Sequence, residues 1–157
     1  MFAALELPEQ VRAALVGWSK QALGGVQGLR GIGTQDLHAT LCFLGSQPAG
    51  QLAAISDACA VLAAQPAPRL QLGEPVWLPA RRPRVVAVTL QDAPGALARV
   101  QAALADVLAA GGWYEPEERP YLGHVTTARL ARGTRVPRRA LPATPELAFR
   151  GERVTLY

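Results

Sequence analysis

Both histidines of this 157-residue chain occur in the same tripeptide pattern. The first is His38-Ala39-Thr40, and the second is His124-Val125-Thr126, 86 residues later. Side chains alternate between the two faces of a β-strand, so residues two positions apart share a face, about 7 Å from each other. Two such strands lying side by side would bring two imidazoles and two hydroxyls together. We therefore expect a single site built from both halves of the chain.

This set of groups suits acid–base cleavage of a phosphodiester. A neutral imidazole can take a proton from the attacking oxygen, and an imidazolium can give one to the leaving oxygen. Histidine serves in both roles because its ordinary pKa is about 6.5. The two threonine hydroxyls would bind the non-bridging phosphate oxygens. With threonine and arginine donors to stabilise the developing charge, the reaction needs no metal and no cofactor.

The structural alternatives concern single residues. A histidine beside an apolar strand is more often a hydrogen-bonded structural residue than a catalyst, but two histidines in one pattern favour catalysis. Two histidines without nearby acidic or cysteine ligands fall short of a zinc site. We interpret Cys42 as core, and we expect Phe43, an odd step from His38, to face the packed side. Arg129 would face away from the site unless its strand ends or bulges.

Composition indicates a folded domain rather than a disordered or membrane-spanning chain. Half of the residues are hydrophobic, and no apolar run is long enough to cross a bilayer. The start "MFAALELPEQ" lacks the basic region of a signal peptide, and two cysteines are too few for a disulfide framework. We expect one cytoplasmic domain spanning residues 1–157, monomeric and without a membrane partner.

Basic residues are unevenly distributed along the chain. Residues 1–78 hold four basic and five acidic residues, whereas residues 79–157 hold twelve arginines and seven acidic residues. A GC-rich genome would explain the general preference for arginine. The arginine clusters favour a second interpretation, a surface for phosphates, which arginine binds with two hydrogen bonds. We expect Arg81, Arg82, Arg132 and Arg135 to belong to this surface.

The sequence pattern predicts an α+β domain in which strands outnumber helices. Strands are expected at 2–7, 37–44, 69–78, 84–90 and 121–130, with two short ones within 145–157. Helices are expected at 8–23, 46–64 and 92–112, the last with Asp92 as N-cap and Gly111 as its stop. A glycine-rich loop would end near residue 33. A weak repeat is also visible: one strand–helix–strand unit contains His38 and a second contains His124, and in both the helix precedes the histidine-bearing strand.

These residues resemble the two-histidine (2H) phosphoesterase family, and in particular its bacterial and archaeal RNA 2',3'-cyclic phosphodiesterases, historically called 2'-5' RNA ligases. The segment "LHATLCFLG" matches the family pattern His-x-Thr-Leu-x-Phe-Leu-Gly, and "HVTTAR" matches Pro-His-Val-Thr-Leu-Ala-Arg. Supporting matches at "MFAALELPEQVRAAL", "RRPRVVAV" and "ERVTLY" extend the resemblance over nearly the whole chain.

The resemblance implies a bilobed fold in which two antiparallel sheets, related by a pseudo-twofold axis, line a central groove with helices outside. It implies hydrolysis of an RNA 2',3'-cyclic phosphate to a 2'-phosphomonoester, and the same groups could run the reverse 2'-5' ligation. His124 would be the proton acceptor that activates water, and His38 the proton donor to the 3' oxygen. Thr40, Thr126 and Arg129 would bind the phosphate. The RNA backbone would follow Arg81, Arg82, Arg132 and Arg135.

The sequence departs from the family pattern in three places. Gly123 replaces the usual proline before the second histidine, which should loosen the start of that strand. Ala39 and Thr127 replace leucines that face away from the site. Relatives usually continue beyond Tyr157 with a short extra segment.

Two other functions remain open at this point. The chain could be a non-catalytic module that binds RNA ends, or a 2H phosphodiesterase acting on 2'-5' oligonucleotides or another nucleotide. The aromatic candidates for stacking on a base are Phe2, Phe43, Trp77, Trp113, Tyr114 and Tyr121, and the sequence assigns none of them.

Overall fold

The computed structural model describes residues 1–92, 95–134 and 139–157. Its strands form one antiparallel sheet of eight: β1 (Phe2–Glu6), β2 (Leu29–Gly31), β3 (His38–Phe43), β4 (Arg69–Leu78), β5 (Val85–Gln91), β6 (His124–Leu130), β7 (Ala148–Arg150) and β8 (Val154–Leu156). The helices are α1 (Glu9–Leu23), α2 (Leu52–Ala58) and α3 (Ala96–Ala110). The expected α+β class is confirmed.

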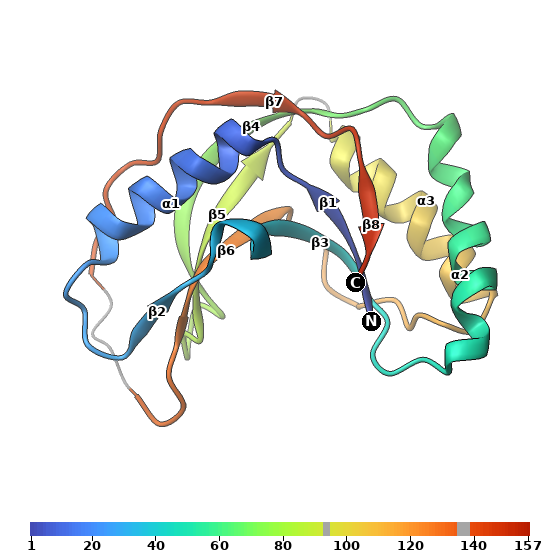
Figure 1. Ribbon diagram of the computed structural model, residues 1–157, viewed down its shortest axis with the longest axis horizontal. Coiled ribbons are helices and arrows are strands. Elements are labelled where there is room, and N and C mark those ends of the chain that lie inside the picture. Colours follow the sequence, from blue (N-terminus) through green and yellow to red (C-terminus); the bar gives the residue numbers. More distant parts are fainter. Residues whose placement is uncertain (93–94, 135–138) are drawn as a thin grey trace.

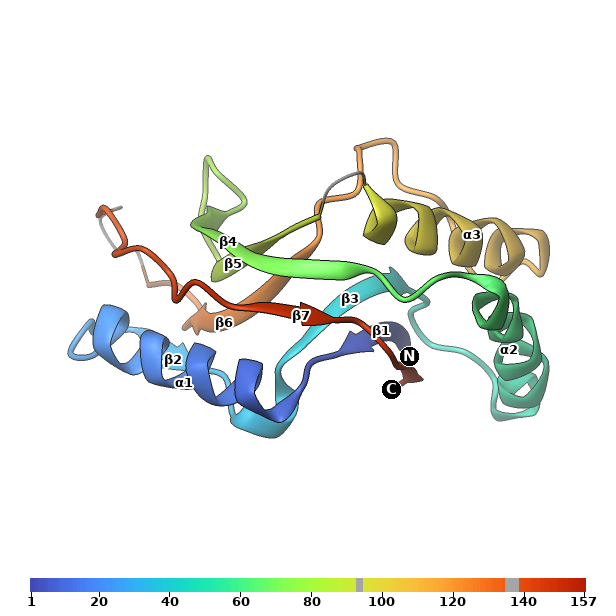
Figure 2. The same cartoon turned by 90° about the horizontal axis from the view of Figure 1, so that it is seen from above.

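The sheet curves into an arch, and its two halves join at the centre. Its order is β7-β4-β5-β6-β3-β1-β8, with β2 pairing with β6 beside the main path. Figure 1 shows α1 over one side of the arch and α2 and α3 over the other, and Figure 2 shows the same separation from above. The expected two separate sheets are not found, because β3 pairs with β6 through Ala39 and Val125.

The two long helices follow directly from their sequences. Buried residues recur every three or four positions along α1 and α3, which gives each helix one apolar stripe. Pro8 immediately precedes α1, where its missing N–H is not needed. The prediction that Asp92 is the N-cap of this helix is wrong, because α3 begins at Ala96 and Gly95 is its N-cap. The Asp92 carboxylate still accepts a hydrogen bond of 2.6 Å from the N–H of Leu97 in the first turn.

Two segments differ from the sequence prediction. The helix expected at 46–64 is divided into a 3₁₀ turn Ala49–Gln51, the short helix α2, and a 3₁₀ segment Cys59–Ala64. Only Ile55 of α2 is buried, so little packing energy supports a longer α-helix there. The glycine-rich loop contains the strand β2, which forms because β6 offers it a partner. No helix among the described residues is long and apolar enough to span a membrane.

Candidate active site

The two His-x-Thr segments lie on the neighbouring central strands, His38 and Thr40 on β3 and His124 and Thr126 on β6. Along each strand the alternating burial places the histidine and threonine on the open face and the residue between them in the core, where Ala39 and Val125 are fully buried. A cavity of about 270 Å³ is lined by Ile32, Asp36, His38, Thr40, His124, Thr126 and Arg129. The structure therefore brings together five of the predicted site residues.

A β-bulge on β6 explains how Arg129 reaches this cavity. The register of β6 against β5 skips Thr127, since Ala87 pairs with Thr126 and Val86 pairs with Ala128. The extra residue reverses the alternation, so Arg129 shares a face with His124 and Thr126. Thr127 is buried, and its hydroxyl donates to the Val86 carbonyl at 3.2 Å while its own carbonyl accepts the N–H of Ile32 at 2.9 Å.

A second β-bulge lies on β3, and it contradicts one prediction. The register of β3 against β1 skips Leu41, since Ala4 pairs with Thr40 and Ala3 pairs with Cys42. Leu41 and Cys42 are both buried, so the assignment of Cys42 to the core is confirmed. The prediction that Phe43 faces the packed side is wrong, because the bulge turns it to the open face, where it is 68% exposed.

A local hydrogen bond fixes the orientation of the His124 ring. Its Nδ1 lies 2.8 Å from the backbone carbonyl of Leu122. A carbonyl oxygen can only accept, so Nδ1 carries the proton of this bond. In the neutral ring Nε2 is then unprotonated and free to accept a proton.

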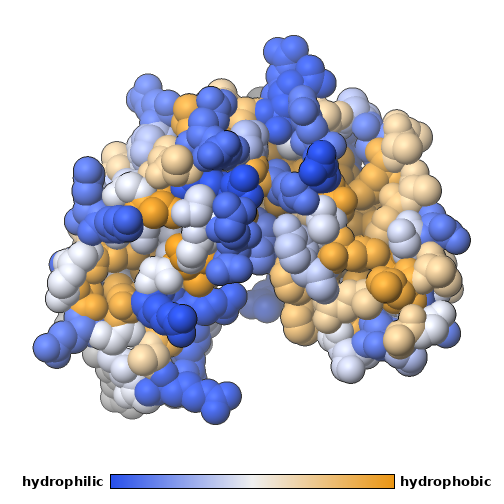
Figure 3. Space-filling model, in the orientation of Figure 1, coloured by the Kyte–Doolittle hydropathy of each residue, from blue (hydrophilic) through white to orange (hydrophobic). Residues whose placement is uncertain are grey.

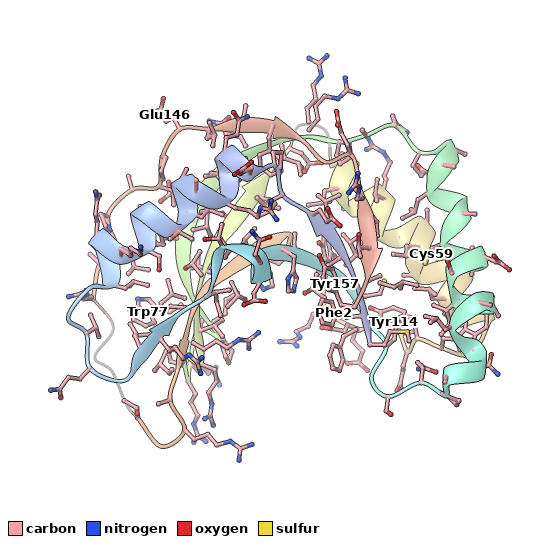
Figure 4. The ribbon with its side chains drawn as sticks, in the orientation of Figure 1. Phe2, Cys59, Trp77, Tyr114, Glu146 and Tyr157 are labelled. Carbon is pink, nitrogen blue, oxygen red and sulfur yellow. The ribbon has the colours of Figure 1, made fainter. Side chains whose placement is uncertain are left out.

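His38 lies in an aromatic cluster instead. Its ring stacks on Phe2 at 4.9 Å and on Tyr157 at 5.5 Å between centroids, and Phe2 and Tyr157 stack on each other at 5.1 Å. Figure 4 shows Phe2 and Tyr157 side by side in this cluster. Burial lowers the pKa of His38, and the positive charge of Arg129 lowers it further, whereas a hydrogen bond with the backbone of Asp36 and the negative charge of the Asp36 side chain act in the opposite direction.

Two further contacts fix the strands that carry the site. Tyr121 is largely buried and donates its hydroxyl to the backbone carbonyl of Thr40 at 3.0 Å, which makes it a support for β3 rather than a stacking surface. At Gly123 a Cβ atom would lie 2.7 Å from Leu97 Cδ2. The glycine that replaces the family's proline thus lets the side chain of Leu97 pack against the backbone just before His124.

Arginines gather at the end of the cavity where β2 and β6 run together. Arg30 pairs in register with Arg129, and the exposed Arg84 and Arg132 adjoin the end of β6. The arginine ion pairs among the described residues join Arg119 to Glu117, Arg150 to Glu152 and Arg153 to Glu6. The four arginines at the end of β6 therefore have no ion pair with an acidic residue in the part of the chain that the structure describes. In Figure 3 hydrophilic side chains are prominent along the lower edge of the half that carries β2 and β6.

The other predicted backbone contacts lie outside the cavity lining. Arg81 and Arg82 are exposed in the connection between β4 and β5, and Arg132 is exposed after β6. Arg135 falls outside the described residues. None of these positions tests the predicted path of the RNA backbone.

Sequence reasoning missed two residues of the cavity lining, Ile32 and Asp36. Ile32 lies in the expected glycine-rich loop, and Asp36 lies in the 3₁₀ turn between that loop and β3. Asp36 is two residues before His38, and that spacing was the available signal for an acid on the same side of the chain as the histidine. Among the described residues, no group of three or more His, Cys, Asp and Glu side chains is arranged to hold a metal ion.

Comparisons with known proteins agree with this geometry. A family model described as the 2'-5' RNA ligase superfamily matches residues 9–157. TT0787 of Thermus thermophilus is 30% identical with a TM-score of 0.79, covering 98% of this chain and 84% of its own. E. coli LigT complexed with 3'-AMP is 24% identical with a TM-score of 0.78 over the same shares. The MHV ns2 PDE domain is 12% identical with a TM-score of 0.70, covering 96% and 87%.

No curated protein sequence matches the chain. The family model nevertheless covers almost all of it, and the 30% identity to TT0787 extends over nearly its full length. The paired His-x-Thr strands and the matching fold point to the same group. The chain belongs to the 2'-5' RNA ligase superfamily of 2H phosphoesterases.

Proposed function

We propose that this protein hydrolyses RNA 2',3'-cyclic phosphate ends to 2'-phosphomonoesters without a metal ion. The observation that supports this most is that the cavity lining includes two imidazoles, two hydroxyls and one guanidinium on a single open face. Each imidazole can transfer a proton, and the remaining groups can donate hydrogen bonds to phosphate oxygens. Together these groups supply the proton transfers and the charge stabilisation for phosphodiester cleavage.

His124 acts as the general base in this proposal. Its Nδ1 proton is held by Leu122, so Nε2 accepts a proton from water as the water oxygen bonds to phosphorus. The bond from phosphorus to the 3' oxygen breaks. His38 gives its proton to that oxygen, which leaves a 3'-hydroxyl and a 2'-phosphate.

Thr40, Thr126 and Arg129 stabilise the charge that develops on the non-bridging oxygens. The two hydroxyls come from the same strands as the histidines, so they are held in a fixed relation to the two proton-transfer groups. Arg129 adds a full positive charge within the cavity lining. Removing one such donor from an enzyme typically costs about 10²–10³ in rate.

The relatives support a nucleotide substrate. E. coli LigT has been crystallised with phosphate and with two nucleotides that carry phosphate groups, 3'-AMP and ATP. The reverse reaction, in which a 5'-hydroxyl replaces water, uses the same two histidines and would give the 2'-5' ligation of the superfamily name. Water is present in large excess, so hydrolysis is the net reaction we propose.

The test uses a short RNA that ends in a 2',3'-cyclic phosphate, incubated with the protein in EDTA. We expect a 2'-phosphate product from the wild type and none from His38→Ala or His124→Ala. Circular dichroism of both variants checks that they are folded, and Lys20→Ala, on the exposed face of α1, is the matched control.

A folded wild type that leaves this RNA intact would overturn the proposal. A parallel reaction with a 2'-5'-linked oligonucleotide would then show whether the cavity acts on that substrate instead. Activity that persists in either histidine variant would reject the two-histidine mechanism, and activity lost in EDTA but restored by a divalent cation would reject metal independence.

A further inference from the structure

The imidazole of His38 lies against the faces of two aromatic rings. Its centroid is 4.9 Å from that of Phe2 and 5.5 Å from that of Tyr157, with interplanar angles of 26° and 24°. The rings of Phe2 and Tyr157 are 5.1 Å apart at 14°, so the three rings are close to parallel. The face of an aromatic ring is negative and attracts a cation within about 6 Å of its centroid. Both rings are therefore placed to interact with an imidazolium.

The backbone of β1 and of the end of β8 holds the two rings in this position. Phe2 and Tyr157 exchange two backbone hydrogen bonds, of 3.0 and 2.9 Å, and their side chains lie next to each other (Figure 4). His38 pairs in register with Glu6 of β1 rather than with Phe2. The rings of His38 and Phe2 therefore lean toward each other over Ala4, whose methyl group is fully buried.

Charged and titratable groups of three other elements surround His38. They are Asp36 of the 3₁₀ turn Thr34–Asp36, Glu6 of β1, and Arg129 and His124 of β6. Burial is the largest cause of the lowered pKa of His38, Arg129 lowers it further, and Asp36 opposes them. The Glu6 carboxylate is bound by the Arg153 side chain at 3.7 Å and by the Thr155 hydroxyl. A proton donor in this position needs a further neighbour that favours its charged form.

We propose that Phe2 and Tyr157 are positioning residues for His38: their ring faces fix the orientation of the imidazole and stabilise its protonated form. The inference rests on the proposed function, in which His38 gives its proton to the 3' oxygen. The same two rings exclude water from the imidazole. Because the imidazolium then lies against two negative ring faces, part of the cost of burying its charge is compensated.

A purely structural role of the rings predicts a shift of the opposite sign. If the rings only cover His38, replacing one of them by a smaller apolar side chain admits water and raises the pKa of His38 toward its ordinary 6.5. If the ring faces stabilise the imidazolium, the same replacement lowers this pKa. The direction of the shift therefore separates the two roles.

Proton NMR without substrate measures the titration, in a His124→Gln background that leaves His38 as the one histidine. Tyr157→Leu and Phe2→Leu should each lower the pKa of His38 and reduce the ratio of imidazolium to imidazole at a fixed pH by about two- to fivefold. Tyr157→Phe keeps the ring and should titrate as the starting protein does. Phe43→Leu, the matched control, removes a 68% exposed ring from the same strand and should leave the titration unchanged.

Turnover of a cyclic phosphate supplies a second readout. On the alkaline side of the pH profile, Tyr157→Leu should lower kcat/KM by the same factor, because less of the proton donor is charged. Tyr157→Phe should restore the wild-type profile. Tyr157 is 47% exposed, so its leucine variant carries the test even where Phe2→Leu does not fold.

A pKa of His38 that is unchanged or raised in Tyr157→Leu would overturn the inference, and so would an equal shift in Tyr157→Phe. The titration uses no substrate, so it is independent of the cleavage test. A lowered pKa in a protein that cleaves no cyclic phosphate would reject the proposed function and keep the two rings as stabilisers of the imidazolium. Cleavage by the wild type together with an unchanged pKa in Tyr157→Leu would do the reverse.

Discussion

The strands β3 and β6 share a His-x-Thr segment followed by a β-bulge, but they present different side chains after the bulge. Each begins with His-x-Thr, each has its bulge at the residue after the threonine, and each bulge turns the fifth residue after the histidine to the open face. On β3 that residue is Phe43, an aromatic side chain that is 68% exposed. On β6 it is Arg129, a cationic side chain that lines the cavity and pairs in register with Arg30. The equivalent positions thus differ only in the side chain they present.

The two histidines also differ in their surroundings, although they occupy equivalent positions on β3 and β6. His124 is held by one hydrogen bond to the carbonyl of Leu122, whereas His38 is packed against Phe2 and Tyr157. A duplicated framework therefore becomes an asymmetric site through the residues that surround it, and the predictions below test this asymmetry.

Apart from the two histidines, whose alanine variants should give no product, the largest effect should come from removing Arg129, the cationic member of the pair. Arg129→Ala takes away the guanidinium from the cavity lining and should lower kcat/KM for a cyclic phosphate by about 10²–10³. Arg129→Lys keeps the charge but loses the two-pronged geometry, so it should recover only part of the activity. Arg153→Ala, whose side chain pairs with Glu6, is the control. An Arg129→Ala enzyme within about threefold of the wild type would remove this residue from the proposed site.

The two threonines should have more equal effects. Thr40→Val and Thr126→Val are close in shape and remove only the hydroxyl, so each should lower kcat/KM by about 10- to 100-fold. Because the two hydroxyls bind the same phosphate, the double variant should lose less than the product of the two single losses. Multiplicative losses would indicate that the threonines act on separate groups, and kinetics of the four proteins decide between these cases.

Much of this arrangement could be read from the sequence because its signals are local. The spacing of His38 and Thr40 fixed their shared face, and the apolar stripes fixed α1 and α3. The bulges could not be found in the same way, because an inserted residue is defined by the register against a partner strand. For that reason Phe43 was assigned to the wrong face, and Arg129 entered through a resemblance rather than through geometry.

Two other misses have the same origin. Strand β2 is three residues of a glycine-rich loop, and it exists because β6 pairs with it. The joining of all strands into one sheet depends on a single register pair between Ala39 and Val125. These features are tertiary, and no local propensity encodes them.

The titration of His38 should respond in opposite directions to its two charged neighbours. Burial and Arg129 lower its pKa from the ordinary 6.5, and Asp36 opposes them. Arg129→Gln should therefore raise this pKa, and Asp36→Asn should lower it. Proton NMR follows the imidazole directly, and His124→Gln leaves one histidine signal to assign. Lys20→Gln, on the exposed face of α1, should leave the titration unchanged.

The pH dependence of turnover follows from the lowered pKa of His38. If His38 is the proton donor, kcat/KM falls as pH rises through its lowered pKa in the free enzyme. A bound phosphodiester is negative and favours the imidazolium, so kcat should fall at a higher pH than kcat/KM does. A profile in which kcat/KM keeps rising through this range would assign the donor role to another group.

The smallest effect tests whether the β6 bulge depends on its buried hydroxyl. Thr127→Val removes the donor to Val86 and leaves that carbonyl without its side-chain partner, which should lower the free energy of unfolding by about 1–2 kcal/mol. Leu41, the corresponding residue of β3, is buried without a polar group, so Leu41→Met should cost less than about 1.5 kcal/mol. Urea unfolding gives both values. A Thr127→Val protein that loses no stability would show that strand pairing alone sets the bulge, whereas a loss with reduced activity would tie the hydroxyl to the placement of Arg129.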